Sequence, residues 1–111
     1  MHPKPASVCV FCGARDGVRT GYRDAARDLG AMLAAEGWRL VYGAGDIGRM
    51  GAVADAAKSA GGETFGVIPV HLLSREVAKR SHGRFIVTEN MHERKKVMYM
   101  NSDAIVVLPG G

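Results

Sequence analysis

Two adjacent cations, Arg94 and Lys95, lie where a segment with helical periodicity begins, in the run MHERK that starts at Met91. On a helix, Met91, Arg94, Lys95 and Met98 share one face, which predicts that both cations lie in line with its apolar side. Burying such a charge without a partner costs roughly several kcal/mol, and no acid falls on the same stripe. The partner is therefore an acid from another segment or an anionic ligand, and a guanidinium can hold a phosphate or carboxylate through two parallel hydrogen bonds. In the alternative interpretation, both side chains run along apolar surface into water.

A glycine-rich segment, GAGDIG at residues 43–48, fits the pattern G-x-G-x-x-G between a predicted strand and a predicted helix. Glycines here let the backbone approach a phosphate, and a helix N-terminus favours negative charge, so the pattern indicates an anion site. A dinucleotide site fits less well, because the motif follows the second strand and because Glu63, at the acid spacing, precedes the third strand instead of ending it. Another interpretation gives these glycines only a tight turn and close helix–sheet packing.

Other residues that could take part in catalysis or metal binding give weaker indications. Cys9 and Cys12 form a C-x-x-C pair, but residues three apart on a strand point to opposite faces, and no second cysteine pair completes a zinc site. We therefore predict no metal and no redox role. Taken alone, Glu76 is expected to be a solvated residue on the surface. The histidines lack metal-ligand spacing and no serine lies in a nucleophile elbow, so nothing supports a Ser-His-Asp mechanism.

The elements that must position these residues alternate along the chain. Short runs rich in Val, Ile or Phe, bounded by Gly, Pro or polar residues, predict strands at 7–11, 39–42, 64–68, 84–88 and 104–108. Periodic apolar stripes predict helices through 22–33 and over about 48–60, 72–78 and 91–101. Gly37 and Gly61 are expected to end the first two helices, and Asn90 to cap the last one with Glu93 in a capping box.

This alternation predicts an α/β fold, a Rossmann-like doubly wound parallel sheet with helices on both faces, in a single domain over residues 1–111. In such folds ligands bind beyond the carboxyl ends of the strands. Segments 12–15, 43–48 and 109–111 follow strand ends. We therefore expect the positive pair to face glycine-lined turns at one edge of the sheet, where a small phosphorylated ligand would be held.

Composition narrows the class of protein. The 111 residues are 47% hydrophobic and 23% charged, with a net charge of +4 spread along the chain. This charge favours an anionic small molecule and argues against a nucleic-acid partner. There is no run of about 18 apolar residues and no apolar signal segment near Met1, so we expect no membrane association and a cytoplasmic location.

These motifs resemble those of a known family, the Lonely-guy cytokinin riboside 5′-monophosphate phosphoribohydrolases, many of which were once labelled possible lysine decarboxylases. The resemblance covers nearly the whole chain in order. The most specific pieces are the MHERK helix and the final PGG, because the family signature is M-H-x-R-K followed by P-G-G-x-G-T-x-x-E. The matching pieces are SVCVFCG at 7–13, LVYG at 40–43, GRMGAVADAA at 48–57, GVIP at 66–69, REVA at 75–78, MHERK at 91–95, SDA at 102–104 and LPGG at 108–111.

The resemblance implies hydrolysis of the N-glycosidic bond of AMP or a cytokinin nucleotide without a cofactor, and a homodimer. Arg94 looks like the catalytic arginine and Lys95 its neighbour in the substrate site, while Glu76 looks like a substrate-contacting acid. The substrate-binding set would be Gly13, Gly43, Gly45, Glu76, Met91, Arg94, Lys95, Gly110 and Gly111.

This chain also departs from the family pattern. Ala44 interrupts the commoner triple glycine, and Arg49 replaces a usual leucine. The chain stops at Gly111, before the glutamate of the signature, which would act on the ribose as a carboxylate does in glycoside hydrolysis. We therefore expect a fragment of a longer domain, or a fold completed by another chain. The 111 residues alone should have little activity, and the strand at 104–108 should lose its cover.

Three other functions remain open. One is a non-catalytic nucleotide or cofactor carrier on the same fold, like the related molybdenum-cofactor carriers. Another is an NAD-dependent oxidoreductase, which tight NAD binding would favour. The last is a pyridoxal-phosphate lysine decarboxylase, which needs a buried Schiff-base lysine and a partner for the pyridinium nitrogen, and neither is identifiable in the sequence.

Overall fold

A computed structural model of the chain describes residues 6–12, 20–43, 49–74 and 84–108. Its centre is a five-stranded, fully parallel sheet in the order β4-β3-β2-β1-β5. The strands are β1 (Ser7–Cys12), β2 (Arg39–Gly43), β3 (Thr64–Pro69), β4 (Arg84–Thr88) and β5 (Ala104–Leu108). The α-helices within these described ranges are α1 (Thr20–Ala35), α2 (Arg49–Ser59) and α4 (Met91–Met100). The predicted α/β class and parallel sheet are confirmed, with each predicted strand within one residue of its observed bounds.

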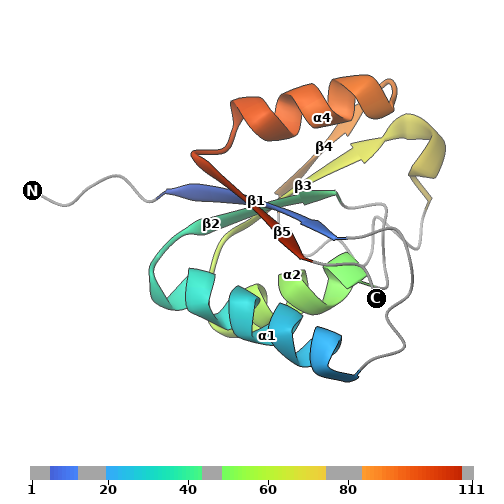
Figure 1. Cartoon of the computed structure of the whole chain (residues 1–111). Helices are drawn as coiled ribbons and strands as arrows, with labels where there is room; N and C mark the ends of the chain where they lie inside the picture. The colour runs from blue at the N-terminus through green and yellow to red at the C-terminus, as the bar shows by residue number, and fades with distance from the viewer. Residues whose placement is uncertain (1–5, 13–19, 44–48, 75–83, 109–111) are drawn as a thin grey trace, which may run out of the picture.

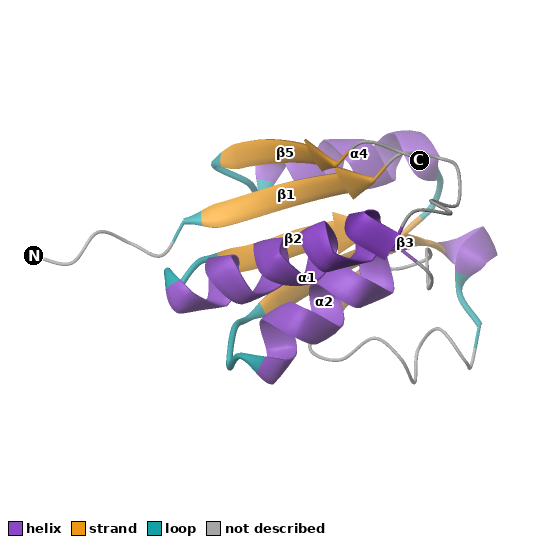
Figure 2. Ribbon diagram, turned by 60° about the horizontal axis from the view of Figure 1, so that its bottom comes forward, coloured by secondary structure: helices purple, strands orange, loops and turns teal. Residues whose placement is uncertain are grey.

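Helices cover both faces of the sheet, as expected for parallel strands joined by crossovers. Figure 1 shows α1 and α2 below the sheet and α4 above it, and Figure 2 shows α1 and α2 side by side on their common face. The two helices pack closely because Gly30 of α1 has no side chain: a Cβ there would collide with the carbonyl oxygen of Val53 in α2.

The alternation of side chains along each strand divides the core into two parts. One buried cluster lies between the sheet and the α1–α2 layer, and a smaller one lies under α4. Val53 and Ala57 of α2 are buried in the first cluster. The second cluster consists of Cys9, Val41, Val67 and Met98, with Phe11, Phe65 and Val97 packed against it.

The helix ends follow the sequence signals. Gly37 and Gly61 adopt positive φ angles of 74° and 82°, the left-handed conformation that commonly ends a helix. Asn90 has extended backbone angles, and its side-chain oxygen accepts a hydrogen bond of 2.8 Å from the Glu93 amide. The N-cap that fixes the start of α4 is therefore confirmed.

The segment after β3 differs from its prediction. In place of a helix from residue 72, a 3₁₀ turn spans Val70–Leu72, and the amide of Leu73 closes it by donating to the carbonyl of Val70. Leu73 then has extended angles (φ −75°, ψ 124°), so no α-helix begins at residue 72 or 73. The rest of the predicted helix, residues 75–78, lies outside the described residues.

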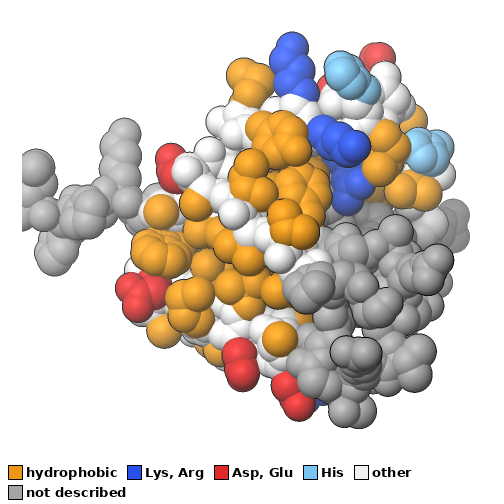
Figure 3. All heavy atoms as spheres, in the orientation of Figure 1, with side chains coloured by type: hydrophobic (Ala, Val, Ile, Leu, Met, Phe, Trp, Pro, Cys, Tyr) orange, Lys and Arg blue, Asp and Glu red, His pale blue; other side chains and the backbone are white. Residues whose placement is uncertain are grey.

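Strand β5 exposes apolar side chains on one face, while Val106 and Leu108 pack against the first cluster. Ile105 is 51% exposed and Val107 is 68% exposed, and on α4 Tyr99 and Met100 are exposed as well. Figure 3 shows hydrophobic side chains gathered across this side of the molecule. None of the described helices combines the length and the hydropathy that a membrane-spanning helix needs.

Candidate functional site

The candidate site lies where β2 ends and α4 begins. All strands are parallel, so the carboxyl ends of β1, β2 and β3 meet at one edge of the sheet. Four of the predicted site residues are described there or on α4: Gly43, Met91, Arg94 and Lys95. The other predicted site residues lie outside the described residues: Gly13, Gly45, Glu76, Gly110 and Gly111.

Arg94 reaches from the second turn of α4 onto the last residue of β2. A Cβ placed on Gly43 would overlap the Nη2 and Cζ atoms of Arg94 and would lie 2.8 Å from its Nε. The guanidinium therefore occupies the space that a side chain at residue 43 would fill, and its Nε is inaccessible to solvent. The arginine does not extend into bulk water, which was the alternative that the sequence left open.

The first turn of α4 shapes the surroundings of this guanidinium. The Nη1 group of Arg94 lies 3.7 Å from the sulfur of Met91, one turn earlier on the helix, and the Arg94 amide donates to the Asn90 carbonyl at 3.0 Å. The N-cap thus fixes the turn from which the side chain projects. Met91 is 39% exposed, so it flanks the guanidinium without covering it.

A buried thiol lies near the same arginine. Burial raises the pKa of Cys9 from 9.0 to about 11, while a hydrogen bond with Ser102 and the positive charge of Arg94 act in the opposite direction. Cys9 is therefore a protonated, apolar group at neutral pH and not a nucleophile. Sequence reasoning set this residue aside. Its place in the arginine's surroundings follows from the alternation along β1, which turns Cys9 towards α4 and Val10 towards α1 and α2.

Lys95 does not lie as predicted. Its side chain is exposed, whereas Arg94, Val97 and Met98 lie wholly or partly buried on the side of α4 that faces the sheet. Successive helical residues are rotated by about 100°, so a face centred on Arg94 carries Met98 inward and leaves Lys95 at its margin. The prediction that both cations lie on the inward face of the helix was therefore wrong for Lys95. The role of Lys95 towards a ligand stays a prediction.

The chemistry that this arrangement offers is the recognition of an anion. A guanidinium held at the carboxyl edge of a parallel sheet can donate two parallel hydrogen bonds to a phosphate or carboxylate. Among the described residues no group of three or more His, Cys, Asp or Glu could hold a metal ion. Cys9 is a free, buried cysteine.

Comparisons with known proteins identify the family of this chain. The sequence model of the family described as "Possible lysine decarboxylase" matches residues 50–111. A probable cytokinin riboside 5′-monophosphate phosphoribohydrolase of Oryza sativa subsp. japonica is 50% identical over 104 residues, which are 94% of this chain and 46% of that protein. A cytokinin riboside 5′-monophosphate phosphoribohydrolase of Mycobacterium tuberculosis is 46% identical over 95% of this chain and 56% of its own length. The chain thus spans about half the length of these curated relatives.

Solved structures of the same fold include the molybdenum cofactor carrier protein of Chlamydomonas reinhardtii. It superposes with a TM-score of 0.79 at 27% identity, over 97% of this chain and 65% of the carrier. A molybdenum cofactor binding protein of Rippkaea orientalis superposes with a TM-score of 0.73 at 25% identity, over 97% of this chain and 64% of that protein. From the matched family model and these identities, the chain belongs to the "Possible lysine decarboxylase" family, the family of the Lonely-guy cytokinin riboside 5′-monophosphate phosphoribohydrolases.

Proposed function

We propose that the protein to which this chain belongs hydrolyses the N-glycosidic bond of AMP or a cytokinin riboside 5′-monophosphate. Water adds across the bond between the base nitrogen and C1′ of the ribose. Its hydroxyl goes to C1′ and its proton to the base, which gives free base and ribose 5-phosphate without a cofactor. The observation that carries the proposal is the guanidinium of Arg94 lying against Gly43 at the carboxyl edge of the sheet, in a chain about half identical to phosphoribohydrolases.

Arg94 would hold the phosphoryl group of the nucleotide. An arginine that is already in position before the substrate binds loses less conformational freedom in the complex, and this favours orientation of the scissile bond. Met91 would line the site beside Arg94, and exposed Lys95 would act from its margin. We place Gly13, Gly45, Glu76, Gly110 and Gly111 in the same site by family resemblance, with Glu76 contacting the substrate.

The ribose-side carboxylate is assigned by the same resemblance. In the family signature P-G-G-x-G-T-x-x-E, a glutamate follows the glycines and would stabilise an oxocarbenium-like transition state or activate the water. Residues 1–111 include only the PGG of this motif. We therefore expect a polypeptide limited to these 111 residues to release little adenine from AMP.

The test is an assay of a protein that contains this chain and the whole signature, with AMP and with a cytokinin riboside 5′-monophosphate as substrates and with free base measured by liquid chromatography. We expect base release from the wild type and a loss of about 10²–10³-fold in Arg94→Ala, the range found when one charge-stabilising group is removed. The matched control is Lys96→Ala, an exposed cation two residues further along α4. A protein that contains the whole signature and releases no base would overturn the proposal.

A second candidate is a non-catalytic carrier of a nucleotide-like cofactor. It is favoured by the superposition on molybdenum cofactor carriers, which extends over nearly the whole chain. Both candidates need an anion-binding arginine, so the discriminating measurement is turnover. A carrier would bind its ligand with Arg94 and release it unchanged, whereas the hydrolase would convert AMP to adenine.

We further propose, from the family resemblance, that the protein is a homodimer with a small-molecule nucleotide as its partner and no nucleic acid. Sedimentation velocity measures the assembly directly. A single species of monomer mass at micromolar concentration would argue against the dimer. The cytoplasmic location expected from the sequence stays a prediction.

A further inference from the structure

A hollow lies at the amino-terminal edge of the sheet, at the opposite end of the strands from Gly43 and Arg94. Its volume is about 310 Å³, at the lower end of the range for small-molecule sites. Strand β2 begins beside this hollow at Arg39 and ends at the candidate site with Gly43, so the two places are separated by the length of the strand. The lining residues are Arg39, Lys58, Gly62, Glu63, Thr64, Phe65 and Arg84.

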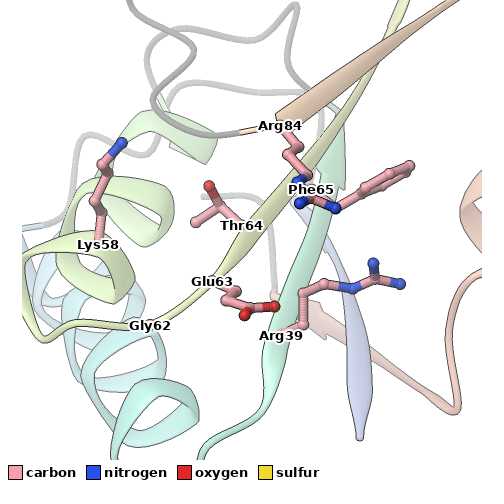
Figure 4. Close-up of a pocket in the computed structure, with 7 residues that line it drawn as sticks. All are labelled: Arg39, Lys58, Gly62, Glu63, Thr64, Phe65 and Arg84. Carbon is pink, nitrogen blue, oxygen red and sulfur yellow. The ribbon is translucent and has the colours of Figure 1, made fainter. Parts of the chain in front are cut away.

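Positive charge dominates the lining. Three cations come from three different elements, Arg39 from β2, Lys58 from α2 and Arg84 from β4, whereas Glu63 is the single carboxylate among the lining residues. Figure 4 shows Arg39 and Arg84 reaching to the side of β3 on which Phe65 lies, while the Lys58 side chain points away from them. The register agrees with this view, because Arg84 pairs directly with Phe65. The two arginines are therefore the groups that can act on one ligand.

Arg39 is held in place by the protein. Its Nε donates to the Ser7 hydroxyl at 3.0 Å, its Nη2 donates to the Asn101 carbonyl at 3.3 Å, and its Cζ lies 4.9 Å from the centre of the Phe65 ring. A guanidinium has five N–H donors, so these two hydrogen bonds leave further donors for a ligand. Its rotamer freedom is already restricted, so binding an anion orders little more of the side chain.

We propose that this hollow is a second ligand site, for a small hydroxylated phosphate ester such as a sugar phosphate. Arg39 and Arg84 would donate to the phosphate, since arginine is the side chain best suited to its planar, bidentate recognition. Glu63, an acceptor only when ionised, would accept from a hydroxyl of the ester. The carboxylate repels any phosphate, but only an ester brings a hydroxyl that can donate to it, so Glu63 favours an ester over inorganic phosphate. This site does not depend on the activity proposed at the opposite edge.

The test is calorimetric titration of the protein with glucose 6-phosphate, which is not a product of the proposed hydrolysis. We expect Arg84→Gln to weaken binding at least about tenfold, the change that corresponds to 1.4 kcal/mol. Arg84 is exposed on an edge strand, so this variant should fold like the wild type, and its thermal unfolding is recorded to check. The control is Arg27→Gln, which removes an equal charge from an exposed position on α1 and should leave affinity within about twofold.

Further titrations separate this site from its alternatives. Inorganic phosphate should bind more weakly than glucose 6-phosphate, and Glu63→Gln should remove most of that difference. The proposal is overturned if glucose 6-phosphate does not bind at millimolar concentration, or if phosphate binds equally well. It is also overturned if Arg94→Ala abolishes binding while Arg84→Gln does not, because the ligand would then occupy the candidate active site. Loss of AMP hydrolysis in Arg94→Ala alone leaves this second site unaffected.

Discussion

The guanidinium of Arg94 occupies the position where a side chain at Gly43 would begin. The two residues are 51 positions apart in sequence, and they meet because β2 ends where the second turn of α4 passes over the sheet. Residue 43 is therefore a glycine for a reason beyond turn geometry. It leaves room for the one cation of α4 that is directed onto the carboxyl edge.

Gly43→Ala tests this relationship. The atoms that the new methyl group would meet are the flexible end of the Arg94 side chain, so the arginine should move and the strand should stay. We expect the free energy of unfolding to change by less than about 1 kcal/mol, while hydrolysis of AMP falls by about 10²-fold because the guanidinium is misplaced. Chemical denaturation and base release measure the two quantities on the same preparation.

Gly37→Ala is the matched control for that variant. Gly37 has a φ of 74°, and nothing lies within 4 Å of the position that a Cβ would take. The substitution should cost about 1 kcal/mol of stability through backbone strain alone, with hydrolysis unchanged. If both glycine variants lose activity in proportion to their stability, the specific role of Gly43 is refuted.

Arg94→Lys separates charge from geometry. The variant keeps the positive charge but loses the planar fork of donors, so a phosphate would be held by one point contact. We expect hydrolysis to fall by about 10²-fold, with the change mainly in kcat/KM, and stability to stay within about 0.5 kcal/mol. Full activity in the lysine variant would show that only the charge matters.

The Cys9 thiol predicts an alkaline limb of the stability profile. Its pKa is about 11 in the folded chain and near 9.0 when exposed, so the unfolded chain releases this proton first as the pH rises. The buried, protonated thiol therefore contributes to the free energy of unfolding. This contribution is fully present below pH 9 and is lost between pH 9 and 11, at about 1.4 kcal/mol per pH unit and up to about 3 kcal/mol in total.

Urea denaturation of the wild type and of Cys9→Ala across this pH range measures that contribution. Burial also raises the pKa of Tyr42, and the nearby Asp55 adds to the rise, so only the difference between the two proteins reports on Cys9. We expect the difference in unfolding free energy to shrink as the pH rises. Parallel curves would contradict the assignment.

Asn90→Ala tests how α4 is fixed. The variant loses the 2.8 Å hydrogen bond from the Glu93 amide to the Asn90 side chain, which should lower the free energy of unfolding by about 1 kcal/mol. Asn90→Asp preserves an acceptor at this position and should retain most of the stability. Thermal unfolding of the three proteins distinguishes a lost cap from a general effect of mutation.

The sequence by itself determined the elements and their class. Alternating apolar runs and helical stripes predicted the five strands and three of the helices, because their signals are local: side-chain periodicity, glycines at helix ends and the Asn90 cap. After Pro69, a 3₁₀ turn at Val70–Leu72 stands where the next helix was expected to begin, and residues 75–78 of that helix lie outside the described residues. Motif resemblance then pointed to Arg94.

Tertiary structure alone decided which cation faces the sheet. Arg94 and Lys95 are equivalent on a helical wheel drawn around the apolar residues, and only the position of α4 over β2 turned the first inward and left the second exposed. The same holds for the hollow at the opposite edge. Arg39, Glu63 and Arg84 come from three strand starts, and their juxtaposition depends on the strand order β4-β3-β2, which no local pattern specifies.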